Sequence, residues 1–217
     1  MNYFKTNNPY KKWKNKAQKF ELNFHINNEW RPSEDFENHS RLLFNFFGFK
    51  EDSFTSKNIL DLGAGSKLRT KYFKGSKIFV IEPLADEFIK NIEWCDLMDA
   101  EKVYSIASEE IVAELVNNID YIFCINVLDH CYDLDKIIYN CNKYLKINGS
   151  ACLSFDIHEE DVDDGHPIHI EKTMFENILT ENGFETSKII TGLPDEDTDS
   201  YGHGDAITYF VKKIKDL

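Results

Sequence analysis

Residues 58–66 read NILDLGAGS, a short apolar run that ends in two closely spaced glycines. A buried strand that runs into glycines lets the backbone turn tightly and approach a ligand without a Cβ in the way. Glu82 closes the next apolar run, 21 residues after Asp61, where a carboxylate can accept both hydroxyls of an adenosine ribose. We therefore predict a nucleoside site formed by Gly63, Gly65 and Glu82.

Apolar runs alternate with helical patterns along the rest of the chain. This alternation predicts an α/β fold: a Rossmann-like doubly wound sheet of about seven strands, mostly parallel, with an antiparallel last strand. The expected strands are 58–62, 78–81, 103–106, 121–125, 151–155, 185–190 and 206–212. The expected helices between them are 66–74, 85–91, 109–117, 134–145 and 171–182. Ligands of such sheets bind beyond the carboxyl ends of the strands.

Two further helices are predicted before the first strand. One spans residues 17–27, and the other starts with Ser33 as its N-cap and ends at Gly48. We assign residues 1–56 to a basic arm and two helices that form a substrate-side cap, and residues 57–217 to the cofactor-binding domain.

The first 20 residues carry six lysines and no acid, interleaved with aromatic side chains. A solvated arm that folds back through its aromatics is the simpler interpretation, and a clamp for an anionic substrate is the alternative. The net charge of −13 disfavours nucleic acid as a partner. Five cysteines without a CxxC pair, no secretory signal and no membrane span predict a cytoplasmic protein.

An ordered set of motifs over residues 57–213 resembles the class I S-adenosylmethionine-dependent methyltransferases. The matching segments are ILDLGAG (59–65), VIEP (80–83), IASE (106–109), DYIFCINVLDH (120–130), YLKINGS (144–150) and the helix-to-strand pattern of residues 175–184. The resemblance implies S-adenosyl-L-methionine as cofactor, bound by Asp61, Gly63, Ala64, Gly65, Glu82, Pro83, Ala107, Ser108, Glu109, Asn126, Val127 and His130. Lys67 and Ser150 depart from the family pattern, each standing where the family has a glycine.

The resemblance implies methyl transfer to a small acceptor, and we expect a hydroxyl of a sugar or metabolite. Residues 21–31 also resemble an N-terminal stretch of some bacterial methyltransferases with surface-sugar functions, which favours a saccharide. An RNA or amine methyltransferase, an NAD(P)-dependent reductase and a non-catalytic binding protein stay open. Leu68 stands where a dinucleotide loop has its third glycine, which disfavours the reductase. The sequence leaves the oligomeric state open.

Four histidines follow the predicted fourth and fifth strands and are candidates for the base that deprotonates an acceptor hydroxyl. They are His130, His158, His166 and His169. A packing role beneath the cofactor is the alternative for His130. The loop that holds the last three is rich in Asp and Glu and could hold a divalent metal, but a solvated acidic loop is the commoner explanation, so we predict no metal.

Overall fold

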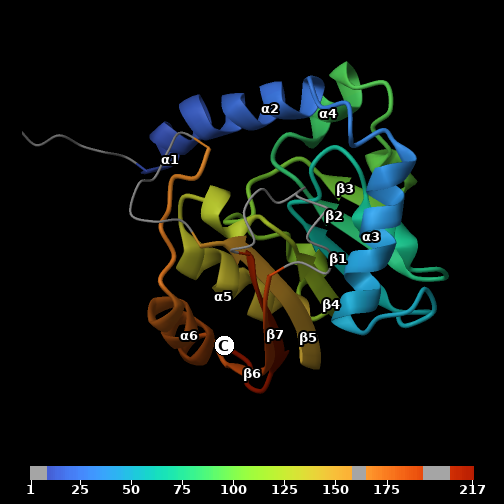
Figure 1. Ribbon diagram of the computed structural model, residues 1–217. Helices are drawn as coiled ribbons and strands as arrows, with labels where there is room; N and C mark the ends of the chain where they lie inside the picture. The colour runs from blue at the N-terminus through green and yellow to red at the C-terminus, as the bar shows by residue number, and fades with distance from the viewer. Residues whose placement is uncertain (1–8, 158–164, 193–205) are drawn as a thin grey trace, which may run out of the picture.

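The computed structural model describes residues 9–157, 165–192 and 206–217. Its centre is a seven-stranded sheet in the order β3-β2-β1-β4-β5-β7-β6 (Figure 1). The strands are β1 (Asn58–Leu62), β2 (Lys77–Ile81), β3 (Lys102–Tyr104), β4 (Ile119–Cys124), β5 (Leu145–Asp156), β6 (Phe184–Thr191) and β7 (Ala206–Lys213). Strands β1 to β5 pair in parallel, and β7 pairs antiparallel with both β5 and β6. The predicted Rossmann-like fold is confirmed.

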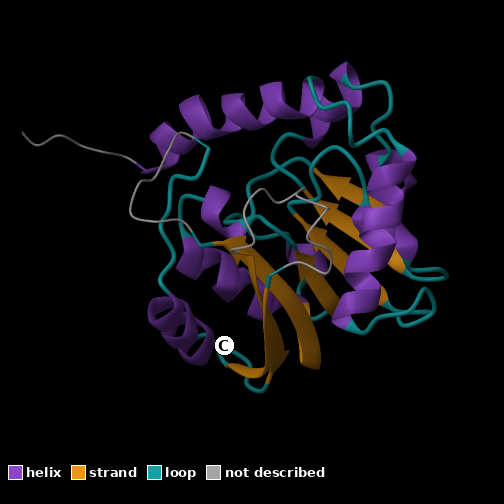
Figure 2. Cartoon of the chain, in the orientation of Figure 1, coloured by secondary structure: helices purple, strands orange, loops and turns teal. Residues whose placement is uncertain are grey.

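Helices cover both faces of the sheet (Figure 2). They are α1 (Pro9–Lys12), α2 (Gln18–Ile26), α3 (Glu34–Phe47), α4 (Ala85–Asn91), α5 (Leu134–Tyr144) and α6 (Lys172–Glu181). On one face, Phe44 of α3 packs in a buried cluster with Phe123 of β4. On the other, Phe175 of α6 packs against Tyr209 of β7 in a second cluster. No helix of the described residues is long and apolar enough to cross a membrane.

The predicted N-terminal helices are present, with two differences. A π-helical stretch at Trp13–Ala17 joins α1 to α2, so the first helix begins at Pro9 rather than at residue 17. Ser33 is the N-cap residue of α3, but its hydroxyl donates to the Trp30 carbonyl and does not cap the helix. Gly48 ends α3 in the left-handed conformation (φ 93°), as predicted.

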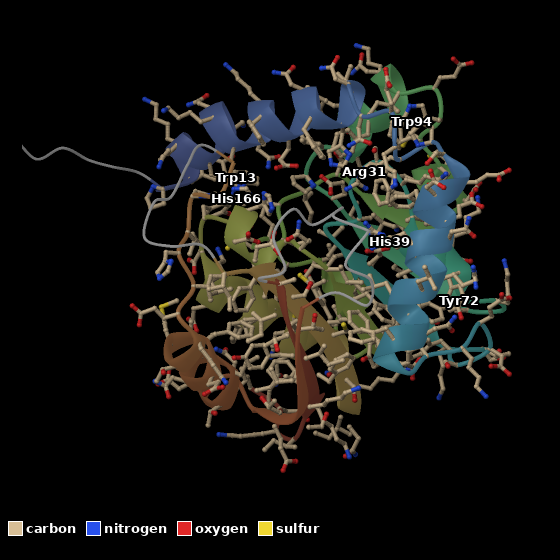
Figure 3. All side chains as sticks on the ribbon, in the orientation of Figure 1. Trp13, Arg31, His39, Tyr72, Trp94 and His166 are labelled. Carbon is tan, nitrogen blue, oxygen red and sulfur yellow. The ribbon has the colours of Figure 1, made fainter. Side chains whose placement is uncertain are left out.

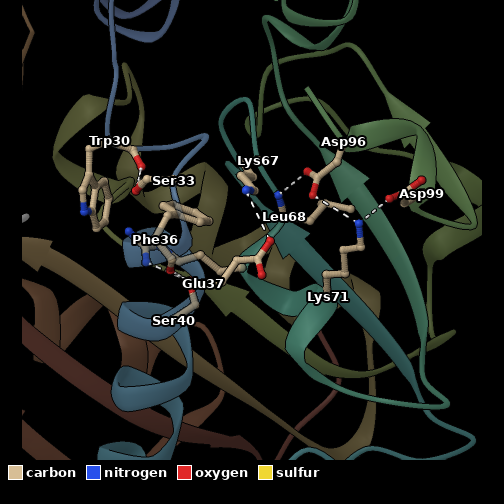
Figure 4. Close-up of polar contacts among 11 residues, drawn as sticks. Trp30, Ser33, Phe36, Glu37, Ser40, Lys67, Leu68, Lys71, Asp96 and Asp99 are labelled. Atoms are coloured by element: carbon tan, nitrogen blue, oxygen red, sulfur yellow. Dashed lines mark hydrogen bonds and ion pairs between the residues drawn. The ribbon is translucent and has the colours of Figure 1, made fainter. Parts of the chain in front are cut away.

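The helix predicted over residues 66–74 is wrong: a 3₁₀ turn at Arg69–Tyr72 replaces it. The Leu68 amide donates to the Asp96 carboxylate, and Lys71 pairs with Asp96 and Asp99 (Figure 4). Asp96 and Asp99, from a distant part of the chain, thus bind the Leu68 amide and the Lys71 ammonium group. These tertiary contacts override the helical pattern of residues 66–74.

The helix predicted over residues 109–117 is also wrong, because only Ala113–Leu115 form a 3₁₀ turn. The Val112 amide donates to the Tyr144 hydroxyl of α5 rather than to a helical carbonyl. The buried Glu109 carboxylate is engaged by backbone amides of the segment that follows β4. Both failures lie in connections at the carboxyl edge of the sheet, where the cavity opens.

Candidate active-site cavity

A cavity of about 990 Å³ lies at the carboxyl ends of β1, β2, β4 and β5, between the sheet and α2. Ligand pockets usually span roughly 300–1,000 Å³, so this one can hold a nucleoside cofactor and a second small molecule. Its walls include 11 of the 12 predicted cofactor residues. The exception is Ala107, which is buried in a small cluster with Trp13 and Ala17 of the N-terminal helix.

The glycine loop after β1 is shaped by two residues in the left-handed region, Gly63 (φ 76°) and Gly65 (φ 67°). A Cβ on Gly63 would lie 2.5 Å from Val127 Cγ1, and one on Gly65 would lie 2.6 Å from His25 Cε1. Both glycines are therefore required by their conformation and by the close approach of a neighbouring side chain.

Glu82, at the end of β2, is a buried carboxylate that holds the glycine loop. Its Oε2 accepts from the Gly65 amide at 2.9 Å, and its Oε1 accepts from the Leu84 amide at 2.9 Å. Burial raises the pKa of Glu82 to about 7, against the opposing effect of these two bonds. Each oxygen keeps a second lone pair for a ligand hydroxyl.

Asp61 supports the loop from below. Its Oδ2 accepts from the Thr70 hydroxyl at 2.6 Å, which fixes the 3₁₀ turn after the loop. Burial raises the pKa of Asp61 to about 6, although the Thr70 bond opposes the rise.

Helix α2 lies across the cavity and contacts both of its ends through two residues that sequence reasoning did not single out, Glu21 and His25. His25 Nδ1 lies 2.7 Å from the Ser66 hydroxyl and accepts from the Ser66 amide at 3.3 Å. Burial, with the charges of Arg31 and His130, lowers the pKa of His25 to about 2, so the docked imidazole is neutral. The i, i+4 spacing of an acid and a histidine on a predicted helix was the available signal.

Where β4 ends, Asn126 adopts a left-handed conformation (φ 56°) and its amide donates to the Ser154 hydroxyl. Its side-chain Oδ1 is buried and has no hydrogen-bond partner among the described residues, and the same holds for Gln18 Oε1. Both residues line the cavity, so two acceptors are available to a ligand with N–H or O–H groups. Glu109, in contrast, is occupied: its Oε1 accepts from the Tyr132 amide at 2.8 Å.

The two histidines His130 and His166 come together on the cavity wall, with ring centroids 4.5 Å apart. Asp129 Oδ1 lies 3.9 Å from His130 Nε2, and Glu21 Oε1 lies 3.0 Å from His130 Nδ1. Burial disfavours charge on His130, but Asp129 and Glu21 outweigh it and raise the pKa of His130 to about 9. Trp13 also donates to the His130 carbonyl at 2.8 Å, at the same end of the cavity as His166 (Figure 3).

The other two candidate histidines are not placed on this wall. His169 does not line the cavity, and His158 lies outside the described residues. Asp156 lines the cavity, whereas the rest of the acidic run, residues 159–164, falls outside the described part of the chain.

Sequence reasoning also missed a cationic wall beside α3. Arg69 lies 4.5 Å from the ring of Phe36 and 5.7 Å from that of Trp30, and Arg31 lies 5.5 Å from the Phe36 ring. Arg69 also contacts His39 Nδ1 at 3.0 Å, and both residues line the cavity. The aromatic rings hold the two guanidinium groups at the cavity, on the glycine-loop side.

No protein-family model matches the chain, and no curated protein matches it. Its fold is nevertheless shared by many solved structures. The N-methyltransferase NodS from Bradyrhizobium japonicum, in complex with S-adenosyl-L-homocysteine, superposes with a TM-score of 0.62 at 18% identity, over 92% of this chain and 98% of that one. A 1,6-didemethyltoxoflavin N1-methyltransferase from Burkholderia thailandensis, also with S-adenosylhomocysteine, gives 0.61 at 13% identity, over 92% and 87%.

The cyclase SpnF gives a TM-score of 0.60 at 13% identity, over 91% of this chain and 94% of that one. At such identities the likeness establishes the fold of the S-adenosylmethionine-dependent methyltransferases for this chain. It does not assign the reaction, because the same fold occurs in a cyclase.

Proposed function

We propose that the chain is an S-adenosyl-L-methionine-dependent methyltransferase whose acceptor is a small molecule with hydroxyl groups, such as a sugar. The observation that carries this proposal is the hydrogen bond that joins the glycine loop to Glu82 in the cavity beneath helix α2. A carboxylate at the end of β2 that is already bonded to the Gly65 amide is placed to accept from the ribose hydroxyls.

The described residues fit this cofactor. The cavity has the size for it, and the buried acceptors Gln18 Oε1 and Asn126 Oδ1 suit the ammonium group of a methionine moiety. Arg31 and Arg69 provide positive charge for its carboxylate. When bound, the cofactor supplies an electrophilic methyl group on a positively charged sulfur.

The acceptor end is assigned to the side of β4 and β5, where Asp156 and His166 line the wall. The chain must hold the acceptor oxygen in line with the methyl carbon and remove its proton. Because His130, with a pKa of about 9, carries a proton at neutral pH, it is suited to donate a hydrogen bond. His166 lies on the same wall and is the candidate base. Polar side chains such as Asn38 and His39 also line the cavity, which suits a hydroxylated acceptor.

The test is turnover with methyl-labelled S-adenosylmethionine against a panel of sugars, nucleotide sugars, polyols, small amines and RNA. Transfer of label to a hydroxylated small molecule, lost in Glu82→Ala, supports the proposal. Label transfer only to amines or RNA would contradict the proposed hydroxyl acceptor and indicate an amine or RNA methyltransferase. Cofactor binding without any transfer, in a protein that rearranges a substrate instead, would place the chain with the non-methylating members of the fold.

A further inference from the structure

Three side chains on the β4–β5 side of the cavity form a cluster with metal-ligating atoms. Asp129, His130 and His166 each offer one ligand atom, and the three atoms lie within 4.8 Å of one another. The first two belong to the 3₁₀ turn after β4, and His166 comes from the loop after β5. The Ile168 amide donates to the Asp129 carbonyl at 3.4 Å, which ties the loop to the turn.

The surroundings of His130 resemble those of a metal-bound histidine. Its Nδ1 lies 3.0 Å from Glu21 Oε1, while its Nε2 faces Asp129 at 3.9 Å. A carboxylate on one ring nitrogen fixes the orientation of the ring, and a metal that binds the other nitrogen displaces its proton. Trp13 holds the backbone of the same residue through a hydrogen bond of 2.8 Å.

The charge at this place also favours a cation. Three acidic side chains, Glu21, Asp129 and Asp156, line the cavity wall or lie behind it, and Asp129 is completely buried. A divalent ion bound between Asp129 and the two imidazoles would offset the negative charge of these three carboxylates in a site with little solvent.

We propose that Asp129, His130 and His166 bind one divalent transition-metal ion, with open positions toward the cavity. Two imidazoles and one carboxylate suit Mn²⁺, Fe²⁺, Co²⁺ or Zn²⁺, whereas Mg²⁺ prefers oxygen ligands. This departs from the expectation of no metal. Bonds of about 2.0–2.2 Å require the ligand atoms to draw together, so the loop of His166 moves inward on binding.

The consequence for catalysis rests on the proposed function. A metal with an open position would bind the acceptor hydroxyl and lower its pKa, so that the hydroxyl would lose its proton to water at neutral pH and present an oxyanion to the methyl group. His166 then acts as a ligand in place of a base. Metal binding itself is independent of the cofactor and can be measured without it.

The test is titration of tag-free, chelator-treated full-length protein with Co²⁺, followed by visible absorption, calorimetry and elemental analysis. We expect one ion per chain and absorption bands of nitrogen- and oxygen-ligated Co²⁺. His166→Ala and Asp129→Asn should each weaken binding 10- to 100-fold or more, since each removes a ligand. His169→Ala, in the same loop but not one of the three ligand residues, is the matched control and should bind as the wild type does.

Thermal unfolding of each variant shows whether it is folded; if Asp129→Asn is not, His166→Ala alone decides. Absence of stoichiometric binding, unchanged binding in His166→Ala, or a thiolate charge-transfer band from a cysteine site would overturn the proposal. Calorimetry with S-adenosylhomocysteine on the same metal-free sample separates the two claims. Binding of S-adenosylhomocysteine without binding of metal would contradict only the metal site. Binding of metal without binding of S-adenosylhomocysteine would contradict only the proposed cofactor.

Discussion

The two ends of the cavity are built differently. At the glycine-loop end, ligand recognition rests on backbone geometry, with Gly63 and Gly65 in left-handed conformations and Glu82 bonded to two amides. At the β4–β5 end, it rests on side-chain charge, with His130 between two carboxylates. Under the proposed function, the first end suits a nucleoside framework beside the guanidinium groups of Arg31 and Arg69, and the second suits proton transfer. Helix α2 contacts both.

The largest effect is expected from Gly63→Val, which tests whether the loop end depends on backbone geometry. A side chain here meets Val127 at 2.5 Å and is strained at φ 76°, so S-adenosylhomocysteine affinity should fall at least about 100-fold in calorimetry. Gly75→Ala is the control, because Gly75 has φ 72° but its Cβ would face Thr55, away from the cavity. Equal losses of affinity in both variants would show that backbone strain, rather than the shape of the glycine loop at the cavity, is responsible.

Glu82→Gln should weaken S-adenosylhomocysteine about 10- to 100-fold, because charge-assisted hydrogen bonds to the ribose contribute roughly 1.5–3 kcal/mol. The variant keeps the volume of the side chain and one acceptor oxygen. Calorimetry measures the loss, and the position of the unfolding transition shows whether the loop is still formed. An unchanged dissociation constant in a folded variant would show that Glu82 does not bind the ribose hydroxyls.

The affinity for 5′-methylthioadenosine should depend on pH through Glu82. The pKa of Glu82 in the free protein is about 7, and the ribose hydroxyls bind the ionised form. Protonation therefore competes with binding, and the dissociation constant should rise by up to about tenfold per unit as pH falls below 7. This ligand lacks the amino-acid group, so its own ionisation does not interfere. Glu82→Gln should give a flat profile, and a sloping one would assign the dependence to another group.

The smallest effect is expected for the docking of helix α2, which contacts both ends of the cavity. The docked His25 has a pKa of about 2 against an ordinary value of 6.5, so docking of α2 is stabilised above pH 6.5 and weakens as pH falls below it. The loss is about 1.4 kcal/mol per pH unit at most. Hydrogen exchange of residues 18–26, corrected for its intrinsic pH dependence, should be faster at pH 5.5 than at pH 7.5. His25→Asn should remove that difference, and an equal difference in the variant would exclude His25 as its cause.

The sequence predicts the strands and the glycine-loop end well, because apolar runs, glycines and a strand-end acid are local signals. It fails where long-range side chains capture the backbone: Asp96 holds the Leu68 amide, and Tyr144 holds the Val112 amide, so two predicted helices do not form. The meeting of His130 with His166 and Glu21 joins three distant parts of the chain. No local pattern could indicate that contact, so the sequence left four histidines as candidates for the base.

The most direct test of the central claim, that the glycine loop and Glu82 hold an adenosyl group, is one pair of calorimetric titrations of the wild-type protein. S-adenosylhomocysteine should bind with one site per chain, while NADH should give no heat of binding. Binding of NADH without binding of S-adenosylhomocysteine would contradict the account.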